Sequence, residues 1–155
     1  MRIVVVSDTH GRADLLAEAL RQVGHTDMLL HLGDGERDCD NLETPYGGEI
    51  LRVRGNCDIA SLEPADRLVP LDGGTLYLCH GHLLDAKHTL YRLWARGREV
   101  QAALLCFGHT HQPLLDRQGD LILLNPGSLR YSGTYALLDT GKTPWGIEMR
   151  QLFPA

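Results

Sequence analysis

The sequence has no long apolar run and no cluster of basic residues. None of its hydrophobic segments approaches the roughly 18 residues that a membrane-spanning helix needs. Lysine and arginine number 15 against 20 acidic residues, which gives a net charge of −5 with histidine neutral. Nucleic acids and membrane surfaces are polyanions, so this charge disfavours both as partners. The amino terminus also has no signal-peptide pattern, so we expect a cytoplasmic protein.

Cysteine is scarce and is not paired in the sequence. The four cysteines form no C-x-x-C motif, which disfavours a zinc site built from cysteines. We expect them to be reduced, with Cys79 and Cys106 on buried strands. A length of 155 residues suits one domain over residues 1–155.

Hydrophobic patterning predicts alternating strands and helices. In the predicted strand 2–6, residues 3–6 form a continuous β-branched run, typical of a strand buried on both faces. Apolar residues at helical spacing predict helices over 13–23, ended by Gly24, and over 84–96, ended by Gly97. A polar stretch over 36–49 predicts a loop with one helical turn. The other predicted strands are 28–32, 50–53, 68–71, 75–79, 102–107, 121–124, 134–138 and 145–152.

Polar side chains follow five of these strands directly. The clusters consist of aspartate, asparagine and histidine, and never of lysine or arginine: Asp8 with His10, Asp34, Asn56, His80, and His109 with His111. Carboxylate, amide and imidazole groups are ligands for divalent transition metals. Seven ligands are too many for one ion with open positions, but they fit two ions that share a bridging carboxylate.

In this order, the motifs resemble those of the calcineurin-like metallophosphoesterase superfamily, in particular its small single-domain bacterial and archaeal phosphodiesterases. The motifs are Asp8-x-His10, Gly33-Asp34, Gly55-Asn56-Cys57-Asp58, His80-Gly81-His82 and Gly108-His109-Thr110-His111, and Asn125-Pro126-Gly127-Ser128 is also similar. The resemblance implies an α/β fold, a four-layer α/β/β/α sandwich of two mixed sheets flanked by helices.

The resemblance also implies a role for each ligand position. Asp8, His10 and His111 would bind the first metal. The second metal would be bound by Asn56, His80 and His109, and Asp34 would bridge the pair. Two divalent ions are expected, with manganese favoured and iron, cobalt, zinc or nickel as alternatives.

The implied function is hydrolysis of phosphate esters by a metal-activated water, most simply as a phosphodiesterase. A nucleotide-directed phosphatase is one alternative. A non-catalytic interaction scaffold is the other, since the retromer subunit of this branch has the same fold. The expected partner is a small phosphodiester or phosphomonoester rather than nucleic acid or a membrane. A homodimer is compatible with the sequence, but no motif decides the oligomeric state.

One departure from the superfamily pattern leaves the general acid unassigned. Cys57 stands where many members have a histidine that assists the leaving group. We hypothesise that His82, or a water held by the metals, takes that part, so Asn56 and His82 are the catalytic candidates. Cys57 and Arg54 are candidates for substrate binding, although a plain surface arginine is the simpler interpretation of Arg54, as it is of Arg130.

The remaining polar residues have simpler interpretations. His25, His31 and His88 lie away from the strand ends and are expected to be surface or packing histidines. Asp38 and Asp40 are expected in a solvated acidic loop. Asp58 either orients a metal ligand as a hydrogen-bond acceptor or caps a helix, and the sequence does not separate these two roles.

Overall fold

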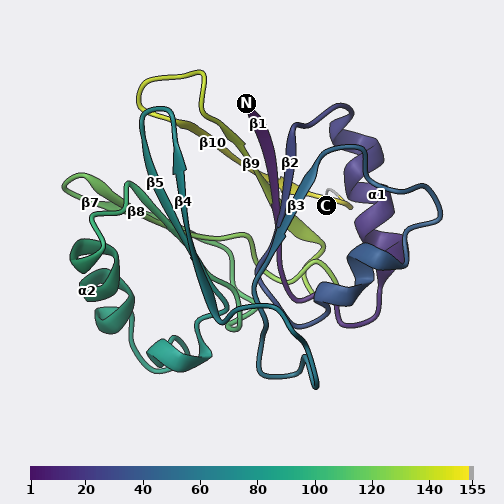
Figure 1. The fold of residues 1–155 in the computed structure, drawn as a ribbon, viewed down its shortest axis with the longest axis horizontal. Helices are drawn as coiled ribbons and strands as arrows, with labels where there is room; N and C mark the ends of the chain where they lie inside the picture. Colours follow the sequence, from purple (N-terminus) through teal and green to yellow (C-terminus); the bar gives the residue numbers. More distant parts are fainter. Residues whose placement is uncertain (154–155) are drawn as a thin grey trace.

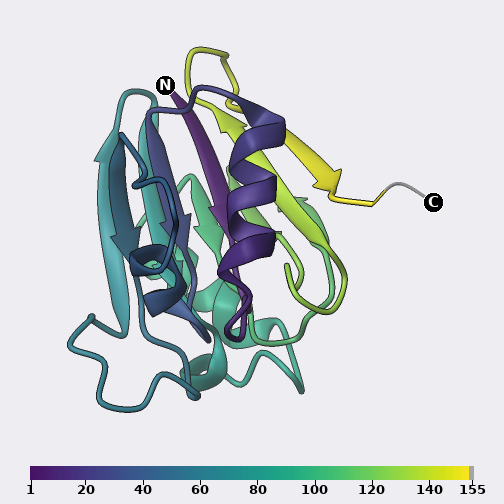
Figure 2. The same ribbon diagram turned by 90° about the vertical axis from the view of Figure 1, so that its right-hand side faces the viewer.

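The computed structural model describes residues 1–153, which fold into two face-to-face mixed sheets of five strands each. Helix α1 (Ala13–Val23) covers the outer face of one sheet, and helix α2 (Tyr91–Glu99) covers the other (Figure 1). The layers therefore run α/β/β/α, and the predicted fold class is confirmed. The view turned by 90° shows α1 lying along the first sheet (Figure 2).

The first sheet has the strand order β10-β9-β1-β2-β3. Its centre is parallel, since β1 pairs with β2 and β2 with β3 in the same direction, and β9 and β10 join antiparallel. The strands are β1 (Arg2–Val6), β2 (Met28–His31), β3 (Glu49–Arg52), β9 (Thr134–Asp139) and β10 (Gly146–Gln151).

The second sheet has the strand order β4-β5-β6-β8-β7. Strands β5, β6 and β8 are parallel, whereas β4 and β7 form antiparallel hairpins with β5 and β8. The strands are β4 (Asp66–Leu71), β5 (Gly74–Cys79), β6 (Leu104–Cys106), β7 (Leu114–Gln118) and β8 (Leu121–Asn125).

Apolar side chains fill the spaces between the layers, in three clusters among residues 1–153. Alternation along each strand divides them: Ile3 and Val5 face the space between the sheets, whereas Val4 and Val6 face α1. The third cluster joins the second sheet to α2 and contains Trp94. The buried Cys79 and Cys106 lie on β5 and β6, as expected, and the described residues contain no disulfide.

The second helix begins later than predicted. Residues 82–84 form a short 3₁₀ helix, η2 (His82–Leu84), and Asp85 then adopts a left-handed φ of 58° that interrupts any helix from 84 onward. Helix α2 starts only at Tyr91 and continues through Gly97 to Glu99. Gly97 is thus not the helix stop. A Cβ there would lie 2.6 Å from a methyl carbon of Leu121, so glycine is needed for close packing against β8.

One strand has no counterpart in the prediction. Strand β7 lies at the edge of the second sheet, and four of its five residues are exposed. Because neither face is buried over most of its length, it lacks the apolar alternation by which strands are recognised. In the polar stretch over 36–49, the predicted helical turn is present as the 3₁₀ helix η1 (Glu36–Asp40).

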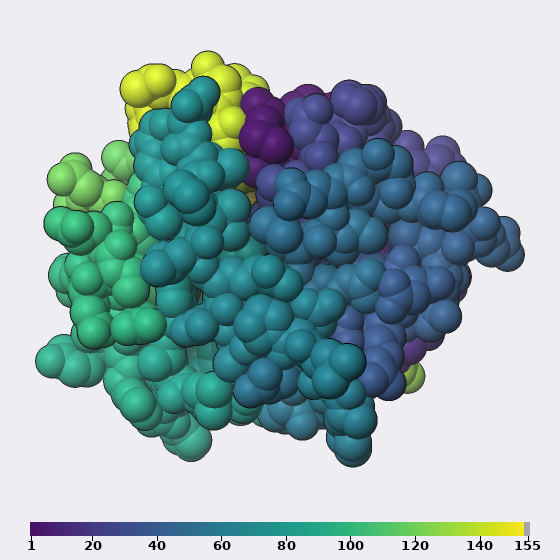
Figure 3. Space-filling view, viewed as in Figure 1, coloured from purple at the N-terminus to yellow at the C-terminus, as the bar shows by residue number. Residues whose placement is uncertain are grey.

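The parallel strands of both sheets end at the same edge of the sandwich, where their loops gather (Figure 1). In the space-filling view, blue and teal segments form the lower part of the surface at this edge (Figure 3). Among the described residues, no helix is long and apolar enough to cross a membrane.

Truncation of the core between the sheets should destabilise the fold. Leu78 is fully buried in that core, so Leu78→Ala should lower the free energy of unfolding by about 2–5 kcal/mol, measured by urea denaturation. The matched control is Leu68→Ala on the neighbouring strand, where the side chain is 54% exposed and the expected change is within about 0.5 kcal/mol. Equal losses in both variants would contradict this placement of the core.

Candidate metal centre

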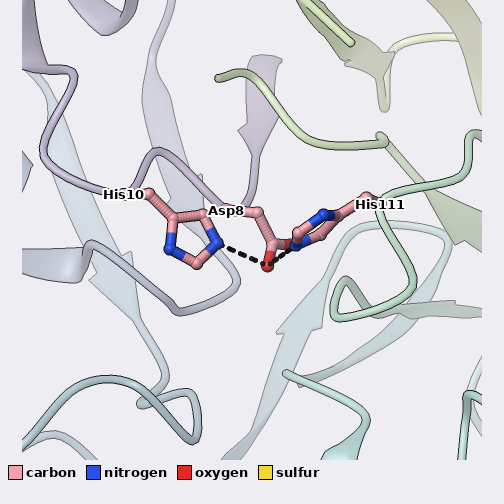
Figure 4. Close-up of side chains that lie close together, drawn as sticks. All are labelled: Asp8, His10 and His111. Atoms are coloured by element: carbon pink, nitrogen blue, oxygen red, sulfur yellow. Dashed lines mark hydrogen bonds and ion pairs between the residues drawn. The ribbon is translucent and has the colours of Figure 1, made fainter. Parts of the chain in front are cut away.

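The strand-end loops bring six of the predicted ligands and Cys57 together. Three overlapping groups have one potential ligand atom per residue within 4.8 Å of one another: Asp8, His10 and His111; His10, Asp34 and Cys57; and Asp34, His80 and His109. His10 and Asp34 each belong to two groups, so the three form one continuous cluster. Figure 4 shows the first group, in which both imidazoles face the Asp8 carboxylate.

Each of the two central carboxylates has one oxygen bound by the protein and one facing imidazoles. Asp8 Oδ2 accepts hydrogen bonds from the Ser7 hydroxyl and the His109 N–H. Its Oδ1 lies 3.1 Å from His111 Nε2 and 3.6 Å from His10 Nε2.

Asp34 repeats this arrangement. Its Oδ1 accepts a hydrogen bond of 2.8 Å from the Cys57 N–H, and its Oδ2 lies 3.2 Å from His80 Nε2 and 3.9 Å from His10 Nε2. Both carboxylates are buried, with 0% of Asp8 and 3% of Asp34 exposed. One oxygen on each is therefore held by donors of the protein, and the other is directed at the histidine cluster.

His80 is oriented as a metal-ligating histidine usually is. Its Nδ1–H donates to the carbonyl oxygen of Leu32 at 2.8 Å, and this directs Nε2, the nitrogen available to a metal, toward Asp34. Within residues 1–153, Nε2 of His80 and Nε2 of His10 are buried without a hydrogen-bond partner. Orphaned buried nitrogens beside carboxylate oxygens fit a divalent cation, which accepts both kinds of ligand.

The charges in the cluster offset one another. Burial opposes ionisation of Asp34, but the adjacent imidazole of His80 holds the pKa of this carboxyl below its ordinary value. Burial also opposes protonation of His80, yet Asp34 and Asp8 raise its pKa. His80 and the two carboxylates thus favour one another's charged forms.

The backbone at the ligand positions is unusual. Eight non-glycine residues of the described chain have positive φ, and five of them are predicted metal ligands: Asp8, His10, Asp34, His109 and His111. A left-handed conformation costs an L-residue about 1 kcal/mol. Here it turns consecutive strand exits so that their side chains point into one shared space.

Close backbone approach requires glycine beside both carboxylates. A Cβ on Gly108 would lie 2.6 Å from Asp8 Oδ2 and even nearer to the Ser7 hydroxyl, and a Cβ on Gly55 would collide with Asp34 Oδ1. The glycines of the Gly108-His109 and Gly55-Asn56 motifs thus allow one loop to contact the carboxylate of another.

The loop after β3 places Asn56 and Cys57 at the exposed side of the cluster. The Asn56 side-chain amide donates to Cys57 Sγ at 3.5 Å. Cys57 belongs to the group with His10 and Asp34, and burial together with the negative charge of Asp34 raises the pKa of its thiol.

Asp58 combines the two roles that the sequence left open. Its carboxylate accepts the N–H groups of Asp34 and Gly55, each at 2.7 Å, and so holds the bridging carboxylate's loop against the next loop. It also accepts the N–H groups of Gly35 and Glu36, where the 3₁₀ helix η1 begins.

His82 and Arg54 lie on the same side of the cluster. The His82 ring is 5.4 Å from that of His80 and 6.1 Å from that of His109, and its buried Nδ1 has no hydrogen-bond partner in residues 1–153. Burial, the charge of His80 and the charge of Arg54 lower the pKa of His82. Arg54 itself is exposed and donates to the carbonyl of Glu63.

A buried network that the sequence did not reveal supports the first two loops. His31 is fully buried and accepts the Gly33 N–H at Nδ1, so its Nε2–H donates to the Thr9 hydroxyl at 2.9 Å. The Thr9 hydroxyl donates to Asp38, which also accepts the Gly11 N–H. The prediction of a solvated Asp38 is therefore wrong, because this carboxylate is needed as an internal acceptor.

The other histidines and Asp40 behave as expected. His25 and His88 are exposed and lie beside the surface carboxylates Asp27 and Asp85. Asp40 is exposed and pairs with Arg52 at 2.6 Å, so the acidic loop is solvated there, in contrast to Asp38.

Comparisons with known proteins identify the same group of proteins by sequence and by structure. The family model described as the calcineurin-like phosphoesterase superfamily domain matches residues 1–143. The probable metallophosphoesterase YsnB of Bacillus subtilis is 33% identical over 133 residues, covering 84% of this chain and 76% of that protein. The phosphodiesterase YfcE of Escherichia coli is 27% identical over 169 residues, with coverages of 90% and 88%.

A crystal structure of a conserved uncharacterised protein from Streptococcus pneumoniae, described as a predicted phosphoesterase, has the same fold. It matches with a TM-score of 0.78 and 27% identity, covering 97% of this chain and 89% of that one.

Acid should destabilise the protein through His31. Burial, the largest effect, lowers the pKa of this imidazole from the ordinary 6.5 to about 3 in the folded protein. Between these values the unfolded chain binds a proton that the folded chain does not. The free energy of unfolding should therefore fall as the pH drops from about 6.5 toward 3, by at most about 1.4 kcal/mol per pH unit.

Chemical denaturation across this pH range measures the slope in wild type and in His31→Gln, which lacks the titrating group. The variant should show the shallower slope. Parallel slopes in the two proteins would contradict a neutral, buried His31.

Proposed function

The chain belongs to the calcineurin-like phosphoesterase superfamily, and we propose that it is a phosphodiesterase that works with two divalent cations. The observation that carries the proposal is the position of Asp34. Its carboxylate is within ligand reach of His10 on one side and of His80 and His109 on the other. A carboxylate between two sets of ligands is the arrangement that a pair of cations requires.

The proposed ligand sets follow the strand exits. Asp8, His10 and His111 would hold the first cation; His80, His109 and the Asn56 amide would hold the second; both sets would share Asp34. Nitrogen and oxygen donors of this kind suit manganese, which we favour, and also iron, cobalt, zinc or nickel. When bound, the cation pair supplies a nucleophilic water of lowered pKa and polarises the phosphoryl oxygens.

The chain's own residues complete the site around the substrate. Arg54, on the exposed side of the cluster near His82, offers a positive charge to the phosphate. Burial lowers the pKa of His82 and so favours its neutral imidazole. We propose that His82 assists as a hydrogen-bond donor to the leaving oxygen rather than as an imidazolium acid. Cys57, also on the exposed side, lines the position of the substrate.

The preference for diesters is supported by the similarity to a relative named as a phosphodiesterase. A nucleotide-directed phosphatase and a non-catalytic scaffold are the alternative functions, and the assays below separate them from the proposal.

Metal-dependent hydrolysis is the first expected outcome. Metal-stripped protein should be inactive on bis(p-nitrophenyl) phosphate and should regain activity with Mn²⁺. Asp34→Asn should lose more than about a hundredfold in rate, because even residues that only support ligands cost 10–100-fold when removed.

The matched control is Asp116→Asn, which changes an exposed carboxylate on β7 and should retain full activity. A wild-type protein that binds two cations yet cleaves neither diesters nor monoesters would favour the scaffold. Faster cleavage of nucleoside monophosphates than of diesters would favour the phosphatase.

His82→Gln should affect poor leaving groups most. Loss of one hydrogen bond to a charged oxygen should lower the rate about tenfold for a phenyl diester and much less for a p-nitrophenyl diester, whose leaving group needs little help. His88→Gln alters an exposed histidine on the turn before α2 and serves as the control. Equal rate losses on both substrates would rule out this role of His82.

A further inference from the structure

We propose that the connection between β8 and β9, residues 126–133, is a strap that positions His10 and His111 as a pair, and that Tyr131 is its principal contact with their rings. The inference rests on the proposed metal centre. The inference goes beyond that metal centre because it assigns a role to Tyr131 and Arg130, neither of which is a metal ligand.

The first ligand set draws on both sheets. Asp8 and His10 follow β1 in the first sheet, whereas His111 follows β6 in the second. Their mutual distances therefore depend on how the edges of the two sheets are held together. The strap leaves β8 in the second sheet and enters β9 in the first, so it crosses between the sheets beside this cluster.

Hydrogen bonds join the strap to the loop after β1. The Leu129 N–H donates to the Ser7 carbonyl at 3.0 Å, and the Ser128 hydroxyl and the Arg130 N–H both donate to the Asp8 carbonyl, at 2.9 and 3.3 Å. The Arg130 guanidinium reaches further and donates to the His10 carbonyl at 2.6 Å. The backbone of two ligand residues is thereby fixed by residues 120 positions away in the sequence.

The strap also joins the loop after β6. The Ser132 hydroxyl donates to the His111 carbonyl at 3.0 Å. The Asn125 side-chain amide, at the end of β8, donates to the Gly108 carbonyl and to the Thr110 hydroxyl, each at 3.0 Å. One segment thus binds the backbone of both loops that carry the first ligand set.

Tyr131 adds contacts with the rings themselves. Its ring is stacked on that of His111, with centroids 5.2 Å apart and planes inclined by 24°, and lies 5.5 Å from the ring of His10. The Arg130 guanidinium lies 5.2 Å from the centroid of the Tyr131 ring and so restrains the tyrosine in turn. The two imidazoles meet edge to face, 5.4 Å apart.

These contacts restrict the rotation of both imidazoles, and so their Nε2 atoms stay directed at Asp8. The Tyr131 side chain is 63% exposed, so it contributes little to the core and its removal should spare the fold. A side chain that orients ligands without supporting the core should influence cation affinity far more than it influences stability.

The test is a calorimetric Mn²⁺ titration of metal-stripped protein, combined with thermal unfolding of the same metal-free samples. Tyr131→Leu should weaken one of the two Mn²⁺ sites about tenfold, leave the other unchanged and leave the unfolding temperature unchanged. Tyr131→Phe keeps the stacked ring and should bind like wild type. Tyr91→Leu, at a tyrosine that is 76% exposed at the start of α2, should also bind like wild type.

The outcomes distinguish failure of the proposed strap from failure of the proposed metal centre. Wild-type protein that binds fewer than two Mn²⁺ ions would overturn the proposed metal centre. Two Mn²⁺ sites in wild type, with unchanged affinities in Tyr131→Leu, would overturn the proposed role of the strap but not the proposed metal centre. Equal weakening of both sites together with a lower unfolding temperature would also overturn it, because Tyr131 would then be a general structural residue.

Discussion

Two buried carboxylates, Asp8 and Asp34, are the constraint on which the rest of the structure depends. Removing a charged carboxylate from water is costly unless donors or counter-charges surround it. Each is met by hydrogen-bond donors of the protein on one oxygen and by imidazoles on the other. The left-handed strand exits, the two glycines that allow close approach and the acceptor Asp58 all serve that arrangement.

The two-sheet sandwich supplies what a single loop could not. Parallel strands of both sheets end at one edge, so short rigid exits, rather than long flexible loops, deliver the side chains (Figure 1). The core between the sheets fixes their separation. The buried His31–Thr9–Asp38 network and the strap over residues 126–133 then fix the loops to one another. Packing and hydrogen bonds elsewhere thus offset the unfavourable free energy of the left-handed backbone at five ligand positions.

The sequence predicted the fold class and most strands because apolar runs of buried strands are local signals. It predicted the candidate ligands because each follows such a run directly, and an ordered series of short motifs is specific. Strand β7 was missed because an exposed edge strand has no buried face, and so its sequence lacks the alternation of apolar and polar residues. The start of α2 was misplaced because the left-handed turn at Asp85 interrupts a helical spacing that the residues otherwise satisfy.

The supporting residues were beyond sequence reasoning for a different reason. Asp38 and Arg130 act on residues 27 and 120 positions away, and Tyr131 contacts His111 and His10, which lie 20 and 121 positions away. Their neighbours in the sequence carry no trace of those contacts. The residues around Asp38 have the polar composition of a solvated loop, and only the fold shows that the Asp38 carboxylate is buried.

Anomalous diffraction of Mn²⁺-soaked crystals tests directly whether Asp34 is shared by two cations. Two anomalous peaks are expected, one on either side of the Asp34 carboxylate. One should lie within coordination distance of Asp8, His10 and His111, and the other within coordination distance of Asn56, His80 and His109. A single peak, or a pair of peaks that do not share Asp34, would show that this carboxylate does not bridge two cations.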